Sequence, residues 1–147
     1  MTRLAGLLDK ARADLEESPK NALGEERDSR WRGRRIVRVG SAWHLGVLLL
    51  TEDAVFATAD VLKVVQPDRR GQVSEVAQQR AELIRRCLLG GFRVGEIVHV
   101  GWEAIDLDEG GGPLKMHDGV PFVQLSSTGR SLPVAAYLAE QVSILRQ

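Results

Sequence analysis

The sequence lacks several features that would point to a function. Its only cysteine is Cys87, so no intramolecular disulfide can form and a disulfide-stabilised fold is excluded. No apolar run in the sequence approaches the roughly 20 residues that span a bilayer. The first residues contain no signal-peptide pattern. We therefore expect a cytoplasmic protein that does not enter a membrane.

Net charge is also absent, because 20 Lys and Arg residues balance 20 Asp and Glu residues. A protein that coats nucleic acid or lies on a membrane surface needs an excess of Lys and Arg, so the balance argues against both. Apolar residues make up 44% of the 147-residue chain, which is enough for a buried core. The length and composition predict a single domain over residues 1–147.

Recognisable catalytic motifs are missing as well. The chain has no Gly-x-Ser-x-Gly elbow, no Ser-x-x-Lys pair and no Walker lysine. Its histidines, His44, His99 and His117, lie on separate predicted elements, and none belongs to a closely spaced metal-binding pair. Cys87 lies on the apolar side of a predicted helix and is expected to be a buried hydrophobe. The sequence thus predicts no catalytic residue, no metal and no cofactor.

Two β-rich regions and three helices account for most of the chain. Residues 36–65 read as an antiparallel β-meander of four short strands, 36–39, 43–50, 54–58 and 61–65, with breaks at 40–41, 51–53 and 59–60. Further strands follow over 96–125, with a hairpin around Asp118-Gly119. Apolar residues at helical spacing predict helices over 3–17, 74–89 and 132–145. Because the strands cluster, the fold class is α+β with a mostly antiparallel sheet. The polar stretch 18–34 lacks periodicity and is predicted to be a mobile loop.

The segment Arg27–Arg38 is the clearest anomaly in composition. It contains six arginines and Trp31, opposed only by Asp28. Guanidinium groups bind phosphate oxygens in pairs and an exposed indole can stack on a base, so the segment is a candidate patch for an anion or a nucleic acid. The candidate residues are Arg30, Trp31, Arg32, Arg34, Arg35 and Arg38. Alternatively, the arginines belong to a charged edge strand and pair with nearby glutamates, which the neutral chain favours.

A second candidate site lies between a predicted strand and the last predicted helix. Backbone amides and the helix dipole favour an anion at such a position. The residues that would bind a small anion are Ser127, Thr128, Gly129, Arg130 and Ser131. The alternative is an ordinary helix start, with Ser131 as the cap and Pro133 in the first turn. A third group, Glu103, Asp106, Asp108 and Glu109, could hold a cation but equally fits a solvated strand end.

Several segments together resemble a known family. They are Leu4–Leu8, Trp43–Leu50, Gly91-Phe92-x-x-Gly95-Glu96 and Ala136–Glu140. They are similar to a small family of uncharacterised bacterial proteins of about this length, some of which carry a glutaminase label. The resemblance covers most of the chain, through motifs that are mainly structural. Serine-dependent glutaminases use a Ser-x-x-Lys pair, which this chain lacks, so no catalytic residue is carried over.

Three functional hypotheses follow from these observations. The first is a non-catalytic binding or interaction module that self-associates, for which a homodimer is the expected state. The second is a small enzyme that acts on an amide or another small anionic substrate, with His44, His99 or His117 as the base. The third, ranked last because the chain is neutral, is nucleic-acid binding through Arg27–Arg38.

Overall fold

The structure, a computed structural model, describes residues 3–66, 74–125 and 129–147. These segments contain three helices and ten strands, most of them paired antiparallel, which confirms the predicted α+β class. None of the helices in these segments is long and apolar enough to cross a bilayer. The helices are α1 (Arg3–Asp14), α2 (Glu75–Leu89) and α3 (Val134–Leu145).

The chain forms two compact units, each with its own cluster of buried apolar side chains. Unit 1 consists of residues 1–20, 42–58 and 102–147, and unit 2 of residues 21–41 and 59–101. The long strand β2 contributes its first part to unit 2 and its last four residues to unit 1. The strands are β1 (Asn21–Ser29), β2 (Gly33–Leu45), β3 (Leu48–Leu50), β4 (Val55–Ala57), β5 (Asp60–Lys63), β6 (Ile97–Val100), β7 (Glu103–Ala104), β8 (Leu114–His117), β9 (Val120–Gln124) and β10 (Ser131–Pro133).

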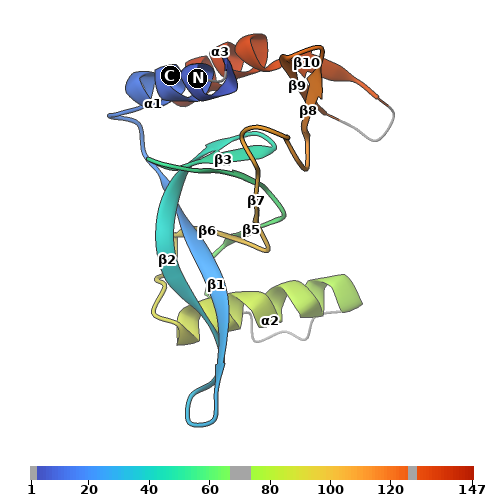
Figure 1. Cartoon of the computed structure of the whole chain (residues 1–147). Coiled ribbons are helices and arrows are strands. Elements are labelled where there is room, and N and C mark those ends of the chain that lie inside the picture. Colours follow the sequence, from blue (N-terminus) through green and yellow to red (C-terminus); the bar gives the residue numbers. More distant parts are fainter. Residues whose placement is uncertain (1–2, 67–73, 126–128) are drawn as a thin grey trace. The chain divides into compact units, whose positions relative to one another are not determined.

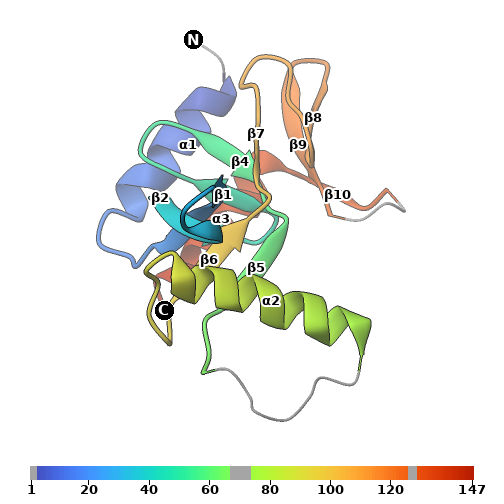
Figure 2. The ribbon, with the colours of Figure 1, turned by 90° about the horizontal axis from the view of Figure 1, so that it is seen from below.

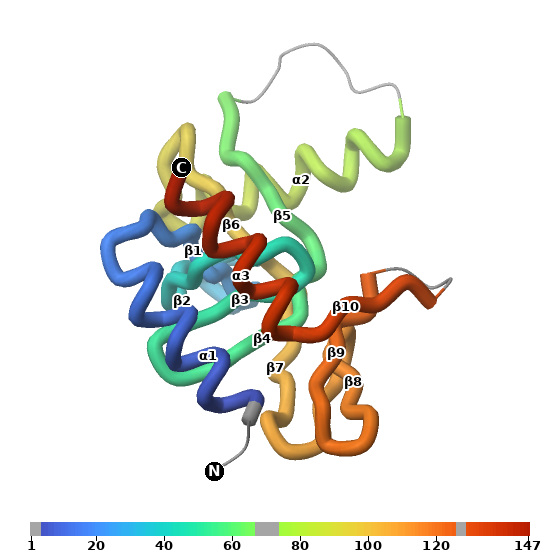
Figure 3. Tube along the Cα trace, turned by 90° about the horizontal axis from the view of Figure 1, so that it is seen from above, coloured from blue at the N-terminus to red at the C-terminus, as the bar shows by residue number. Residues whose placement is uncertain are grey.

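Unit 1 combines helices α1 and α3 with short antiparallel strands. The end of β2 pairs with β3, β3 with β4 and β4 with β7, while β10, β9 and β8 form a separate three-stranded sheet. Figure 3 shows α1 and α3 side by side. Leu4, Leu8 and Ala11 recur on one face of α1 and are buried in the same cluster as Leu138 and Val142 of α3. The predicted Asp118-Gly119 turn joins β8 to β9, with φ of +51 and +79 at the two residues.

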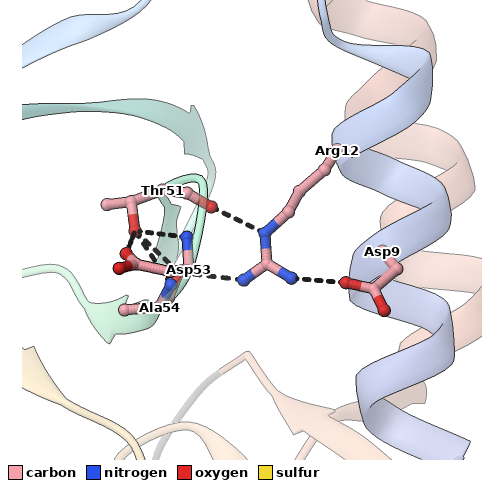
Figure 4. A network of polar contacts seen from close by, with 5 residues as sticks. All are labelled: Asp9, Arg12, Thr51, Asp53 and Ala54. Atoms are coloured by element: carbon pink, nitrogen blue, oxygen red, sulfur yellow. Dashed lines mark hydrogen bonds and ion pairs between the residues drawn. The ribbon is translucent and has the colours of Figure 1, made fainter.

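Arg12 attaches α1 to the turn between β3 and β4 (Figure 4). Its Nε donates to the Thr51 carbonyl oxygen at 2.7 Å, and its Nη2 donates to the Ala54 carbonyl oxygen at 3.4 Å. Its Nη1 donates to Asp9 Oδ1 at 2.8 Å, so a carboxylate one turn earlier holds the guanidinium in place. The Thr51 hydroxyl accepts from the Ala54 amide at 2.9 Å and closes the turn. These bonds fix the position of α1 on the strands of its own unit.

Unit 2 is a small sheet covered by helix α2. Its strand order is β5-β6-β1-β2, with β1 parallel and β5 antiparallel to β6. Figure 2 shows α2 lying across these strands. Cys87 and Leu83 of the helix pack in a cluster with Ile36, Leu62 and Val98 of the strands. Helix and sheet therefore bury a common apolar layer, as expected for an amphipathic helix on a sheet face.

The predicted ends of α2 are confirmed. Ser74 is the N-cap, and its hydroxyl accepts from the Ala77 amide at 3.0 Å. Gly90 is the C-cap, and Gly91 after it has a φ of +102 that residues with a side chain rarely adopt. The chain then turns back, so that the Phe92 amide donates to the Cys87 carbonyl oxygen at 3.0 Å and Phe92 joins the buried cluster.

The first β region differs from the predicted meander. Strand β2 runs without a break past Gly40, whereas the predicted strand 43–50 is broken at Gly46, whose φ is +67. Leu45 pairs with Leu48, so Gly46 is the first of two turn residues, where glycine is required for this turn type. Strands β2, β3 and β4 are consecutive as predicted, but β5 leaves the meander and pairs with β6. The choice of β6 as partner depends on residues almost forty positions away, which no local pattern reveals.

The predicted mobile loop over residues 18–34 is wrong for most of its length, because β1 occupies Asn21–Ser29. Its first residues, including Ala22 and Leu23, are buried between β6 and β2. Its later residues, 25–28, are exposed and charged. A strand that is buried at one end and solvated at the other shows no alternation of apolar and polar residues, and this is why periodicity missed it.

Candidate functional site

The candidate site is the end of the hairpin formed by β1 and β2. We call residues Ser29–Arg35 the hairpin tip. Figure 1 shows the hairpin extending past helix α2 of the same unit. The Ser29 hydroxyl accepts from the Arg32 amide at 2.8 Å, and Gly33 has a φ of +70, so both residues shape the turn. The tip contains four arginines and no carboxylate.

Trp31 lies at the apex of the turn with 92% of its surface exposed. The other two tryptophans have defined partners, since Trp43 donates from Nε1 to the Ser18 carbonyl oxygen at 3.1 Å and Trp102 packs on Phe56. An exposed indole between two arginines leaves a large apolar face in water. Tryptophan and arginine are among the side chains enriched at the positions of protein interfaces that contribute most to binding.

Three of the four arginines of the tip are available for a ligand. Arg30, Arg32 and Arg34 are exposed, and no carboxylate among the described residues lies within ion-pair distance of them. The nearby glutamates have other partners. Glu25 pairs with Arg27 at 2.7 Å, and Glu26 pairs with Arg86 of helix α2 at 2.6 Å. The predicted neutralisation of the arginine segment by neighbouring glutamates therefore applies to Arg27 and not to the tip.

The base of the hairpin is held firmly by the rest of unit 2. Arg86, whose side chain is 17% exposed, joins β1 to α2 through Glu26. Gly24 allows β1 to pack closely, because a Cβ there would lie 2.7 Å from side-chain carbons of Ile36 and Val98. The stem that carries the tip is thus fixed by packing and by an ion pair.

Two arginines of the predicted patch are less accessible to a ligand, because one is paired and the other is half-buried. Arg38 forms an ion pair with Glu96, and its guanidinium lies 5.3 Å from the centre of the Phe92 ring. Arg35 is half-buried on β2, and its Nη1 is buried without a hydrogen-bond partner. The patch predicted from Arg30 to Arg38 therefore narrows to Arg30, Trp31, Arg32 and Arg34.

The chain is neutral overall, but its two units carry net charges of opposite sign. Unit 2 contains thirteen Lys and Arg residues against eight Asp and Glu residues, a net charge of +5. Unit 1 contains seven against twelve, a net charge of −5. Charge asymmetry of this kind is typical of proteins with an anionic partner. The argument from overall neutrality against such a partner therefore does not hold for unit 2.

The second predicted site, the anion site over residues 127–131, does not adjoin the start of helix α3. Ser127 and Thr128 lie outside the described residues. Gly129 and Arg130 are exposed, and Ser131 begins strand β10, where it pairs with Gln124 of β9. The predicted helix start at Ser131 is wrong, because β10 intervenes and α3 begins at Val134 with no side-chain cap. Gly129 and Arg130 precede β10 and Ser131 belongs to it, so none of the three lies in the first turn of α3.

The histidines do not form a common site with other candidate ligands. His99 is fully buried and forms a hydrogen bond with Asn21 Oδ1 at 3.0 Å, between β6 and β1. His44 Nε2 is 2.9 Å from the Gly46 carbonyl oxygen, and His117 packs edge-on against Phe122. Within the described segments, no group of three or more His, Cys, Asp or Glu side chains is placed to hold a metal ion.

Cys87 is buried, and Asp106 of the predicted acidic group accepts hydrogen bonds within a turn. Burial raises the pKa of the Cys87 thiol to about 11, so the reactive thiolate is disfavoured. The Asp106 carboxylate accepts from the amides of Asp108 and Glu109 at 2.7 and 2.9 Å. The amides of Glu109 and Asp108 lower the pKa of Asp106, and the carboxylate thereby closes a turn.

Sequence reasoning missed two features that define the site. Arg86 was not singled out, although it holds the hairpin base, and the contact spans 60 positions in the chain. The charge separation was missed because charge was summed over the whole chain. No family model, no curated protein and no solved structure matches the chain. The functional argument therefore depends on the geometry and charge of the hairpin tip.

Proposed function

We propose that the protein is a non-catalytic binding module that uses the hairpin tip to bind a polyanion. The observation that carries this proposal is the exposed Trp31 between Arg30 and Arg32, which have no carboxylate partner among the described residues. A guanidinium group matches phosphate and sulfate oxygens with two parallel hydrogen bonds. Because these arginines have no carboxylate partner among the described residues, their contacts with an anion break no ion pair of the protein.

The charge of unit 2 supports the same proposal. At 0.1 M salt, charges more than about 10 Å apart are largely screened from one another. A ligand at the tip therefore responds to nearby charges and not to the neutral total. The three exposed arginines of the tip, together with the +5 charge of the unit along which a longer chain could lie, favour an anion that is long enough to contact several of them.

Heparin affinity chromatography tests this proposal, because heparin is a polyanion without bases. We expect the double variant Arg30→Gln/Arg32→Gln to elute at a clearly lower salt concentration than the unmodified protein. The matched control is Lys63→Gln/Arg93→Gln, which removes two exposed cations from the same unit and away from the tip. Its elution should fall between the two and closer to that of the unmodified protein. Equal elution of both double variants would contradict the role of the tip.

A further inference from the structure

We infer that the polyanion is a single-stranded nucleic acid, in which the tip arginines contact phosphates and one base stacks on Trp31. This inference depends on the proposed function and adds the chemical class of the ligand. Base–aromatic stacking needs an accessible indole face, and Trp31 offers one at 92% exposure. Phosphate contacts need cations beside that face, and Arg30 and Arg32 are the adjacent residues on either side.

The surroundings of Trp31 do not fit a docking site for a protein. Tryptophans that anchor protein interfaces lie in the middle of an apolar, well-packed area. Trp31 is the only large apolar residue of the hairpin tip, and its neighbours are arginines and Gly33. The two strands of the tip lie only about 5 Å apart, so the tip alone offers a narrow surface compared with the roughly 800 Å² that each partner buries in a standard protein interface. A few phosphate contacts and one stacked base need no such area.

Accessible bases distinguish a single strand from a duplex. In a duplex the base faces are covered by their neighbours, and a side chain that separates two base pairs must overcome a few kcal/mol of stacking. A single strand exposes its bases between flexible phosphates. In the sequence of the tip one tryptophan stands between two arginines, as a base in the strand lies between two phosphates. The +5 charge of unit 2 would attract the remaining length of the strand.

Fluorescence anisotropy with a labelled mixed-sequence single strand of DNA or RNA tests the inference. Trp31→Ala should weaken binding about tenfold, and Trp31→Phe should recover most of the loss because a phenyl ring still stacks. The control Trp102→Phe changes a tryptophan outside the tip and should bind as the unmodified protein does. In a salt titration, Arg30→Gln/Arg32→Gln should reduce the slope of log K against log salt by about 1.4, or 0.7 for each lost phosphate contact.

Several outcomes would overturn the inference and leave the proposed function standing. If Trp31→Ala binds the single strand as tightly as the unmodified protein while heparin elution still depends on Arg30 and Arg32, stacking plays no part. Equal affinity for a duplex of the same sequence would exclude recognition of exposed bases.

Tighter binding to phosphatidylserine vesicles at equal phosphate concentration would identify a lipid surface. Light scattering that shows self-association lost in Arg30→Gln/Arg32→Gln would identify a second copy as the partner. If the unmodified protein does not bind heparin at all, both proposals are contradicted.

Discussion

Alanine in place of Gly90 is expected to lower the free energy of unfolding by about 3 kcal/mol or more. A Cβ at this position would lie 1.6 Å from the carbonyl oxygen of Ile36 and 2.5 Å from its carbonyl carbon. Both atoms belong to the backbone of β2, so no side-chain rotation can relieve the overlap. Helix α2 would have to move away from the strand, and the cluster around Cys87 and Phe92 would lose its close packing.

Urea unfolding followed by circular dichroism measures this effect, and Gly6→Ala is the matched control. Gly6 lies in helix α1 with nothing within 4 Å of a Cβ placed there. The same substitution should therefore raise the free energy of unfolding at Gly6, by up to about 1 kcal/mol. The rate at which a thiol reagent labels the buried Cys87 reports on unit 2, and it should rise in Gly90→Ala only. A Gly90→Ala protein within about 0.5 kcal/mol of the unmodified one would contradict the close approach of α2 and β2.

Gly46→Ala is expected to be nearly as damaging, by about 3 kcal/mol, for two physical reasons. The φ of +67 at Gly46 is unfavourable for any residue with a Cβ. The new Cβ would also lie 2.0 Å from the Tyr137 hydroxyl. That hydroxyl donates to the Leu45 carbonyl oxygen at 2.7 Å and accepts from the Val47 amide at 2.9 Å. Burial raises the pKa of Tyr137, which keeps the phenol protonated as the donor.

Tyr137→Phe separates the two contributions in a double-mutant cycle. Alone, it should cost about 1–3 kcal/mol, because it leaves the turn amide and carbonyl without their partner. Combined with Gly46→Ala, it removes the oxygen that the new Cβ would meet, and the next atom lies 3.2 Å away. The double variant should therefore lose about 1–2 kcal/mol less than the sum of the single variants. Strict additivity would show that the tyrosine hydroxyl does not hold this turn.

The elements that local patterns define were predictable, and pairings between distant segments were not. Ser74 and Gly91 delimit α2 as expected, and the turn at Asp118-Gly119 joins two strands. Each of these depends on a few adjacent residues. In contrast, Ala22 of β1 pairs with Val98 of β6, and β5 pairs with β6 rather than with β4. Partners so distant in the chain leave no trace in the hydrophobic periodicity of either segment.

The candidate site was predictable in composition but not in detail. The arginine cluster around Trp31 is visible in the sequence, whereas its division into free and occupied groups depends on tertiary contacts. Arg38 pairs with Glu96, and Glu26 pairs with Arg86, which lies 60 positions later in the chain. The argument from overall charge ranked nucleic-acid binding last, because it averaged a basic unit with an acidic one. Charge summed for each compact unit removes that argument for unit 2.

The indole signals of the three tryptophans in a ¹H–¹⁵N correlation spectrum give the most direct test of the hairpin tip as the contact element. The protein is titrated with a short heparin oligosaccharide at low salt. We expect the Trp31 signal to shift in a saturable way, while the signals of Trp43, which is bonded to Ser18, and Trp102, which packs on Phe56, stay in place. A Trp31 signal that does not move while signals elsewhere in the protein shift on saturation would contradict the account.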